Sequence, residues 1–158
     1  MKKSKKIVKL KIDFGSGYNP NKDYKACDIT WLPNLDYVYD QENNAILGCE
    51  DNSVDEFYLR NVVHHIPNME KTFSCLLRYL KADGEIKIID VRREYFKQNV
   101  ILDILWYRYV TPRYEVWFST HYRNYFKVLE NLGMERVSYF IQDEKEVSVW
   151  RRLSKNLK

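Results

Sequence analysis

An apolar run that ends in a two-glycine turn lies near the start of the chain and restricts its fold most strongly. Residues 7–14 are rich in β-forming apolar side chains, a pattern typical of a strand. Gly15 and Gly17 come directly after this run, and glycine lets a backbone turn sharply and pass close to a neighbouring group. A Gly-x-Gly pair alone is also common in ordinary turns. The segment therefore predicts a strand that ends in a tight loop, and a ligand-binding role for the loop needs support from residues further along the chain.

Length and organisation favour one domain. A chain of 158 residues buries roughly 70% of its unfolded surface on folding, which is enough for a hydrophobic core. No internal repeat, low-complexity linker or Ser/Gly/Pro-rich boundary divides it. We therefore expect a single domain over residues 7–153, with basic tails at residues 1–6 and 154–158.

The composition predicts a protein of the cytoplasm. Hydrophobic residues make up 45% of the chain and charged residues 30%, as in ordinary globular proteins. The longest apolar runs are too short to span a bilayer, which excludes a membrane helix. The basic start lacks the long apolar region of a secretory signal, because Lys9 interrupts residues 7–10.

The cysteines indicate neither a metal site nor a disulfide framework. Cys27, Cys49 and Cys75 are an odd number, without a C-x-x-C pair and without a histidine at metal-ligand spacing. We expect three reduced, mostly buried thiols and no bound metal.

The net charge of +4 is distributed unevenly. Residues 1–11 contain six lysines and no acid, residues 12–91 contain seven basic against fourteen acidic side chains, and residues 92–158 contain thirteen against eight. Clustered lysine and arginine attract polyanions, so the basic ends suggest a phosphate-bearing partner. A solvated tail is the alternative interpretation of the lysines at the start.

Strand and helix signals alternate along the chain, which predicts an α/β fold. We expect a Rossmann-like, doubly wound, mostly parallel seven-stranded sheet with a C-terminal antiparallel hairpin. The expected strands are residues 7–14, 26–30, 37–40, 55–63, 86–91, 135–141 and 147–153. The expected helices run from Asn68 to a stop at Asp83 and Gly84, over residues 94–110, and from Ser119 or Thr120 to residue 132.

Polar residues stand where the expected parallel strands end. Ligands of open α/β sheets bind at the carboxyl ends of the strands, and a carboxylate after the second strand can accept both hydrogen bonds of a ribose diol. The polar residues at successive strand ends are Asp13, Asp28, Asp40, Asn61 and Asp90. Together with the glycine turn they predict a nucleoside-binding edge.

These residues resemble a family, the class I S-adenosylmethionine-dependent methyltransferases, and in particular the small type 11 group. The resemblance spans about residues 7–153. Its segments are the glycine-rich first motif at 12–17, the ribose-binding acid at 28–29, the third-strand acid at 39–40, the fourth-strand motif at 51–55 and 63–66, the helix-to-strand signature at 77–86, and the Leu-Gly-apolar ending at 132–134.

The resemblance implies S-adenosyl-L-methionine as the cofactor and methyl transfer as the reaction. His65, and less so His64, is the residue expected to act as general base, because neutral imidazole accepts protons near pH 7. The residues expected to bind the cofactor are Asp13, Gly15, Ser16, Gly17, Asp28, Ile29, Asp40, Gln41 and Asn61.

The sequence also departs from this family. Only ten residues separate Gly17 from Asp28, too few for the helix that usually fills this interval, and Asn19 and Pro20 lie there instead. We also expect no helix before the first strand. These departures predict an open pocket, or one that a second subunit closes in a homodimer.

The methyl acceptor is not identified by the sequence and can be a small molecule, a protein or a nucleic acid. Arginine and tyrosine side chains in residues 92–125 suit a phosphate-bearing or aromatic acceptor, and suit a dimer interface equally well. Two other functions stay open. One is a non-catalytic binding module for a polyanionic partner. The other is an NAD-dependent dehydrogenase, which is disfavoured because Pro20 stands where the third glycine of Gly-x-Gly-x-x-Gly belongs.

Overall fold

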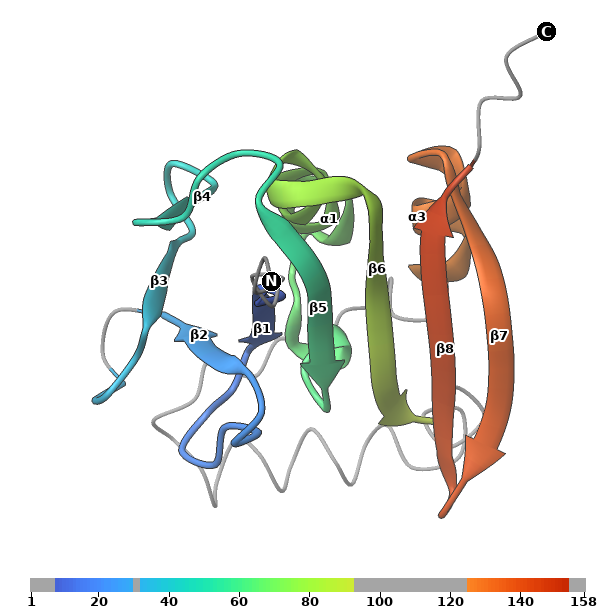
Figure 1. Ribbon diagram of the computed structural model, residues 1–158. Coiled ribbons are helices and arrows are strands. Elements are labelled where there is room, and N and C mark those ends of the chain that lie inside the picture. Colours follow the sequence, from blue (N-terminus) through green and yellow to red (C-terminus); the bar gives the residue numbers. More distant parts are fainter. Residues whose placement is uncertain (1–7, 30–31, 93–124, 154–158) are drawn as a thin grey trace, which may run out of the picture.

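The structure is a computed structural model that describes residues 8–29, 32–92 and 125–153. Within these residues the chain forms one eight-stranded sheet with the order β4-β3-β2-β1-β5-β6-β8-β7 (Figure 1). The strands are β1 (Lys11–Phe14), β2 (Lys25–Asp28), β3 (Tyr37–Asp40), β4 (Ala45–Leu47), β5 (Val54–Arg60), β6 (Leu80–Val91), β7 (Met134–Gln142) and β8 (Lys145–Arg152).

The centre of the sheet is parallel and its two edges are antiparallel. Strands β3, β2, β1, β5 and β6 pair in parallel, whereas β4 pairs with β3, and β8 with both β6 and β7, in antiparallel fashion. The predicted mixed α/β fold is confirmed. The predicted number of seven strands is wrong for the described residues, because the short strand β4 extends the sheet beyond β3.

Two helices, α1 (Met69–Tyr79) and α3 (Tyr125–Asn131), contact each other and share one apolar core. Helix α1 begins where predicted, because the Asn68 side chain accepts a hydrogen bond of 2.9 Å from the Lys71 backbone N–H. A short 3-10 helix, η1 (Val63–His65), connects β5 to this helix.

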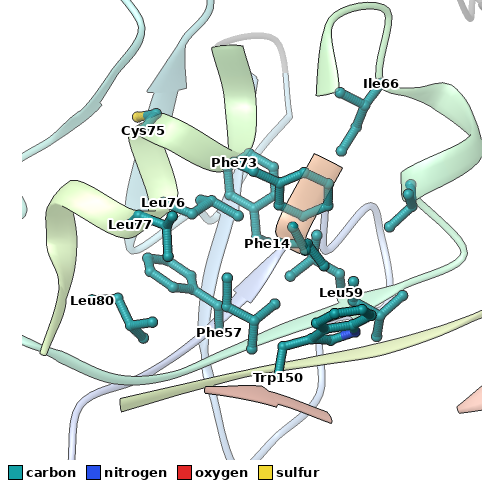
Figure 2. Close-up of a cluster of buried hydrophobic side chains, with 14 of the residues drawn as sticks. Phe14, Phe57, Leu59, Ile66, Phe73, Cys75, Leu76, Leu77, Leu80 and Trp150 are labelled. Atoms are coloured by element: carbon teal, nitrogen blue, oxygen red, sulfur yellow. The ribbon is translucent and has the colours of Figure 1, made fainter. Parts of the chain in front are cut away.

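The core lies between the sheet and the two helices. Figure 2 shows Phe73 and Leu76 of α1 facing Phe57 and Leu59 of β5, with Trp150 of β8 beside them. All five side chains are fully buried. Alternate residues of each strand point to opposite faces, so the residues between these core positions lie on the other face of the sheet.

The predicted end of the long helix is wrong. The helix ends at Tyr79 rather than at Asp83 and Gly84, and residues 80–91 form β6. Arg152 of β8 explains the early end, because its guanidinium donates hydrogen bonds to the carbonyl oxygens of Leu77 and Leu80. These contacts satisfy carbonyl groups at the end of the helix and come from a strand that is distant in sequence.

Several predictions concern residues outside the described ranges. They are the helix over residues 94–110, the start of the last helix, the acceptor region within 93–124 and the basic tails. The doubly wound arrangement also stays a prediction, since both described α-helices pack on one face. No helix among the described residues is long and apolar enough to cross a membrane.

Truncating the core should destabilise the fold strongly. Phe73 is fully buried, so Phe73→Ala should lower the free energy of unfolding by about 3–5 kcal/mol, as measured by urea denaturation. Leu47 is 50% exposed and serves as the control, because Leu47→Ala should change this free energy by less than about 0.5 kcal/mol. Equal effects of the two substitutions would contradict the described core.

Candidate functional site

The carboxyl ends of the parallel strands meet at one edge of the sheet. Phe14 of β1 is in register with Cys27 of β2, and Cys27 with Tyr37 of β3. On the other side of β1, Arg60 at the end of β5 is in register with Ile89 of β6. This edge therefore collects the loops that come after five strands.

The glycine loop folds back onto β2. The backbone N–H groups of Gly15 and Ser16 both donate to the Cys27 carbonyl oxygen, at 2.9 and 3.2 Å. The Gly17 N–H donates to Asp28 Oδ2 at 2.8 Å. Both glycines have positive φ angles, +73° at Gly15 and +57° at Gly17, which explains why the sequence has glycine at both positions.

Gly15 has a second, steric requirement. A Cβ atom at this position would lie 2.2 Å from Val62 Cγ2, far inside van der Waals contact. At Gly17, by contrast, a Cβ atom would meet no atom of the described residues within 4 Å. The loop therefore packs tightly against the segment after β5 at Gly15 and leaves space at Gly17.

Ser16 lies between these glycines and has a buried hydroxyl group. The residue is 6% exposed, and its Oγ has no hydrogen-bond partner among the residues that the structure describes. Buried hydroxyl groups normally have a partner, so an unpaired one in a glycine loop indicates a place for a polar ligand atom. This atom is the most direct sign of a bound group at the edge.

Asp28 ends β2 beside this loop. One carboxylate oxygen accepts from Gly17 N, and the other accepts from the Ile29 backbone N–H at 2.8 Å. A carboxylate offers about four acceptor positions, so Asp28 has capacity left for a diol. Ile29 is the next residue in the same loop and is half-buried.

Asp13, near the end of β1, fixes the later part of the loop between β1 and β2. Its side chain is buried, and Oδ2 accepts a hydrogen bond of 2.7 Å from Asn21 N. Burial raises the pKa of the Asp13 carboxyl group, and the hydrogen bond from Asn21 and the charge of Arg60 oppose this shift. Arg60 also holds the loop, donating to the Asn19 carbonyl oxygen at 2.7 Å. The described residues between β1 and β2 form turns, so the predicted absence of a full helix there is confirmed.

Asp40 ends β3 and stabilises the turn to β4. Its Oδ1 accepts from the backbone N–H groups of Glu42 and Asn43, both at 3.0 Å, and its Oδ2 accepts from Asn43 Nδ2 at 2.8 Å. The bonds from Asn43 hold the pKa of Asp40 below its usual range. The Gln41 carbonyl oxygen accepts a hydrogen bond of 3.1 Å from Lys71 Nζ. The carboxylate of Asp40 therefore already has a local role.

Asn61 comes directly after β5 and has a left-handed backbone conformation with φ +54°. Its backbone N–H donates to the Ile89 carbonyl oxygen at 2.8 Å, and its Oδ1 accepts from Lys145 Nζ at 3.1 Å. The side chain is thus directed to the start of β8, a contact between residues 84 positions apart in the sequence.

His64 is buried and paired with Asp90 of β6. The distance between His64 Nδ1 and Asp90 Oδ1 is 2.6 Å, and Asp90 is fully buried. Asp90 Oδ2 also accepts from the Val63 backbone N–H at 2.9 Å, which fixes η1 to the end of β6. Asp90 is one of the predicted strand-end acids, but it is not among the residues predicted to bind the cofactor or to act as base. The signal for it was an acid that continues the buried alternation of Ile86 and Ile88.

His65 is half-buried next to His64, with 3.9 Å between the two ring centroids. Burial, together with the neighbouring His64, lowers the pKa of His65 to about 4. His65 is therefore neutral throughout the physiological pH range.

The structure brings one group of predicted residues together and separates it from another. Direct hydrogen bonds link the glycine loop to Asp28, and Ile29 adjoins it, while Asp13 supports the loop. Asp40, Gln41 and Asn61 lie at the same edge but contact other partners. Among the described residues no group of histidine, cysteine and acidic side chains could hold a metal ion.

The fold is that of S-adenosyl-L-methionine-dependent methyltransferases. A protein from Methanosarcina mazei described as one is 11% identical, covers 91% of this chain and 92% of its own, and has a TM-score of 0.63. A Sulfolobus solfataricus protein described as a type 11 methyltransferase is 19% identical, with coverages of 93% and 85% and a TM-score of 0.59. Geranyl diphosphate C-methyltransferase from Streptomyces coelicolor, solved with S-adenosyl-L-homocysteine, is 10% identical, with coverages of 92% and 73% and a TM-score of 0.61.

At the sequence level, residues 19–88 match the type 11 family model described as a methyltransferase domain. No curated protein matches the chain significantly. The predicted resemblance to class I methyltransferases of the type 11 group is thus confirmed. The predicted cofactor, S-adenosyl-L-methionine, agrees with this family match. Two of the similar structures, the trans-methyltransferase CalH and the Streptomyces enzyme, were solved with S-adenosyl-L-homocysteine.

Substituting Gly15 tests the contact between the glycine loop and Val62. Gly15→Ala should lower the free energy of unfolding by about 2–5 kcal/mol, because the new Cβ combines a left-handed backbone with a steric clash. Gly17→Ala is the matched control and should cost only about 1–2 kcal/mol, since its Cβ meets open space. Chemical denaturation of both variants measures the difference, and a larger cost at Gly17 would refute the described loop.

The environment of His65 should make stability depend on pH. The unfolded chain protonates histidine near pH 6.5, whereas the folded protein holds His65 neutral down to about pH 4. Between these values the unfolded state binds more protons, so the His65 contribution to stability should fall as the pH falls from about 6.5 to about 4. An NMR titration of the imidazole protons measures the folded pKa directly. A midpoint near 6.5 would show that the ring is not desolvated as described.

Proposed function

We propose that this protein is an S-adenosyl-L-methionine-dependent methyltransferase that transfers a methyl group to an acceptor of as yet unidentified structure. The observation that supports this most directly is the buried Ser16 hydroxyl, which has no partner within the described part of the chain and is held in a glycine loop beside Asp28. The methyltransferase fold and the family match over residues 19–88 support the same assignment.

Ser16, Gly15 and Gly17 would hold the amino-acid end of the cofactor, and Asp28 would bind its ribose diol. Both glycines have positive φ angles, and a Cβ at Gly17 would meet no atom of the described residues within 4 Å, which leaves space for a ligand beside the loop. Asp28 is fixed by two backbone N–H groups, so its carboxylate is already oriented before a ligand arrives. Ile29 supplies an apolar contact next to it.

Asp13, Asp40, Gln41 and Asn61 fit a supporting role in this proposal. Asp13 is buried beneath the loop and orders it through Asn21. Asp40 orders the turn between β3 and β4, and the Gln41 carbonyl ties that turn to α1. Asn61 orders the start of β8 through Lys145. Each of them shapes the edge through protein contacts, which leaves Ser16 and Asp28 as the main polar contacts for the cofactor.

When bound, S-adenosyl-L-methionine supplies a methyl group that its sulfonium makes electrophilic. The chain contributes position, because the rigid loop and the strand ends fix donor and acceptor in a reactive geometry. An acceptor that must lose a proton also needs a base. We propose His64 for this task, since the contact of 2.6 Å between its Nδ1 and Asp90 Oδ1 orients the ring. His65, with a pKa of about 4, holds a proton too weakly to be the main base near pH 7.

The proposals for location and oligomeric state come from the sequence. We propose a cytoplasmic enzyme without a membrane partner, and a homodimer as the arrangement that would cover the edge left open by the missing helix. Size-exclusion chromatography with light scattering measures the oligomeric state.

Calorimetric titration with S-adenosyl-L-methionine tests the cofactor assignment. Asp28→Ala should weaken binding at least ten-fold, since it removes the acceptor for the diol and the anchor of Gly17. Asp51→Asn is the matched control, because the Asp51 side chain is 66% exposed and forms a surface ion pair with Arg78. The affinity of this control variant should equal that of the wild type.

Two results of this titration would contradict the proposal. One is the absence of S-adenosyl-L-methionine binding, and the other is binding that Asp28→Ala leaves unchanged. A parallel titration with NAD separates a dehydrogenase from a methyltransferase. Transfer of labelled methyl groups to fractions of cell extract then distinguishes an active enzyme from a binding module.

A further inference from the structure

The face of the sheet opposite α1 has a row of paired charges at the end away from the glycine loop. Lys11, Glu56, Glu85 and Arg151 lie in register across β1, β5, β6 and β8. Lys11 Nζ lies 2.8 Å from Glu56 Oε2, and Arg151 Nη2 lies 2.9 Å from Glu85 Oε2. Each cation in this row is therefore neutralised by a carboxylate.

Positively charged side chains without a carboxylate partner among the described residues lie on this face toward the carboxyl ends of the parallel strands. Arg60 of β5, Lys87 of β6 and Lys145 of β8 alternate onto the same face, and none of them has a carboxylate partner in the part of the chain that the structure describes. Lys87 Nζ lies 5.9 Å from the centroid of the Tyr58 ring. The net positive charge of this face thus increases toward the edge that contains the glycine loop.

Arg60 directly precedes Asn61 in the chain, and Lys145 contacts the Asn61 side chain at that edge. Arg60 donates to the carbonyl oxygen of Asn19 at 2.7 Å, and Lys145 donates to the amide oxygen of Asn61 at 3.1 Å. Both contacts are to neutral oxygens in exposed positions. Arg60 also feels the charge of Asp13, whose carboxylate is buried and accepts from Asn21.

Cationic side chains that donate to neutral oxygens, next to the edge with the glycine loop, are suited to bind an anion. The donors of these bonds are already charged, so a phosphate or carboxylate in place of a neutral acceptor adds the attraction between opposite charges. The planar guanidinium of Arg60 can bind such a group with two parallel hydrogen bonds, and Lys145 adds a second charge.

We propose that the methyl acceptor carries a phosphate or carboxylate group, and that Arg60 and Lys145 bind this group beside Asn61. The assignment rests on the proposed methyltransferase function, because it places the acceptor next to the glycine loop. Arg60 and Lys145 thereby select for anionic acceptors.

Titration of the full-length protein with inorganic phosphate and, separately, with citrate tests this site. Arg60→Gln and Lys145→Gln should each raise the dissociation constant of the bound anion at least ten-fold. Arg151→Gln is the matched control, because Arg151 lies on the same sheet face but is neutralised by Glu85. It should leave the dissociation constant within two-fold of the wild type.

The outcomes identify the type of anion and test whether Arg60 and Lys145 bind it. Binding of phosphate that depends on Arg60 and Lys145 identifies a phosphate-bearing acceptor, and the same dependence for citrate alone identifies a carboxylate. Binding of neither anion, or equal weakening by Arg151→Gln, would overturn the proposal. S-adenosyl-L-homocysteine binding is measured on the wild type and on Lys145→Gln as well. If the wild type binds S-adenosyl-L-homocysteine but neither anion, the anion site is wrong and the proposed function stands. If the wild type does not bind S-adenosyl-L-homocysteine, the proposed function itself is contradicted.

Discussion

The close contact between Gly15 and Val62 determines the shape of the candidate site. A single Cβ atom at Gly15 would lie 2.2 Å from Val62 Cγ2, so the loop after β1 and the segment after β5 can adopt their positions only with glycine. Val62 is itself held from the other side, since the next residue, Val63, donates its N–H to buried Asp90. Three strand ends are thereby fixed relative to one another.

Asp90 connects this packing to chemistry. Its two carboxylate oxygens bind the backbone of η1 and the ring of His64, so the imidazole and the glycine loop depend on the same buried acid. Burial of a carboxylate is costly unless hydrogen bonds compensate for lost water, and here three donors do so, including the Val91 N–H at 2.7 Å. The site is therefore ordered by the protein itself before a ligand binds.

Short loops replace a helix between β1 and β2. Two side chains order this segment in place of helix packing: Asp13 accepts a hydrogen bond from Asn21, and Arg60 donates one to Asn19. The result is a compact edge with a basic side chain next to the loop. Because turns stand between β1 and β2 in place of a helix, Arg60 reaches Asn19 and its charge lies next to the glycine loop.

Local sequence patterns were sufficient for much of the fold and for the centre of the site. The strand end at Asp40 and the Asn68 cap agree with the structure, because each depends on residues close in sequence. The second strand ends at Asp28, two residues before its predicted end. Strand β4 was missed since three residues give too short a pattern. The end of α1 was misplaced because it depends on Arg152, more than seventy residues away.

The same limit applies to individual site residues. The sequence could place Ser16 and Asp28 at the edge, but the unpaired state of the Ser16 hydroxyl among the described residues depends on packing. Asn61 was expected to face a cofactor, whereas its amide oxygen accepts from Lys145. The pairing of His64 with Asp90 joins residues 26 positions apart, and only the sheet register brings them together.

A crystal structure of the complex with S-adenosyl-L-homocysteine tests the central claim most directly. The account predicts electron density for the ligand along residues 15–17, with a polar ligand atom within hydrogen-bond distance of Ser16 Oγ and the ribose hydroxyl groups on Asp28. Density elsewhere on the molecule, or a Ser16 hydroxyl that remains without a partner in the complex, would contradict it.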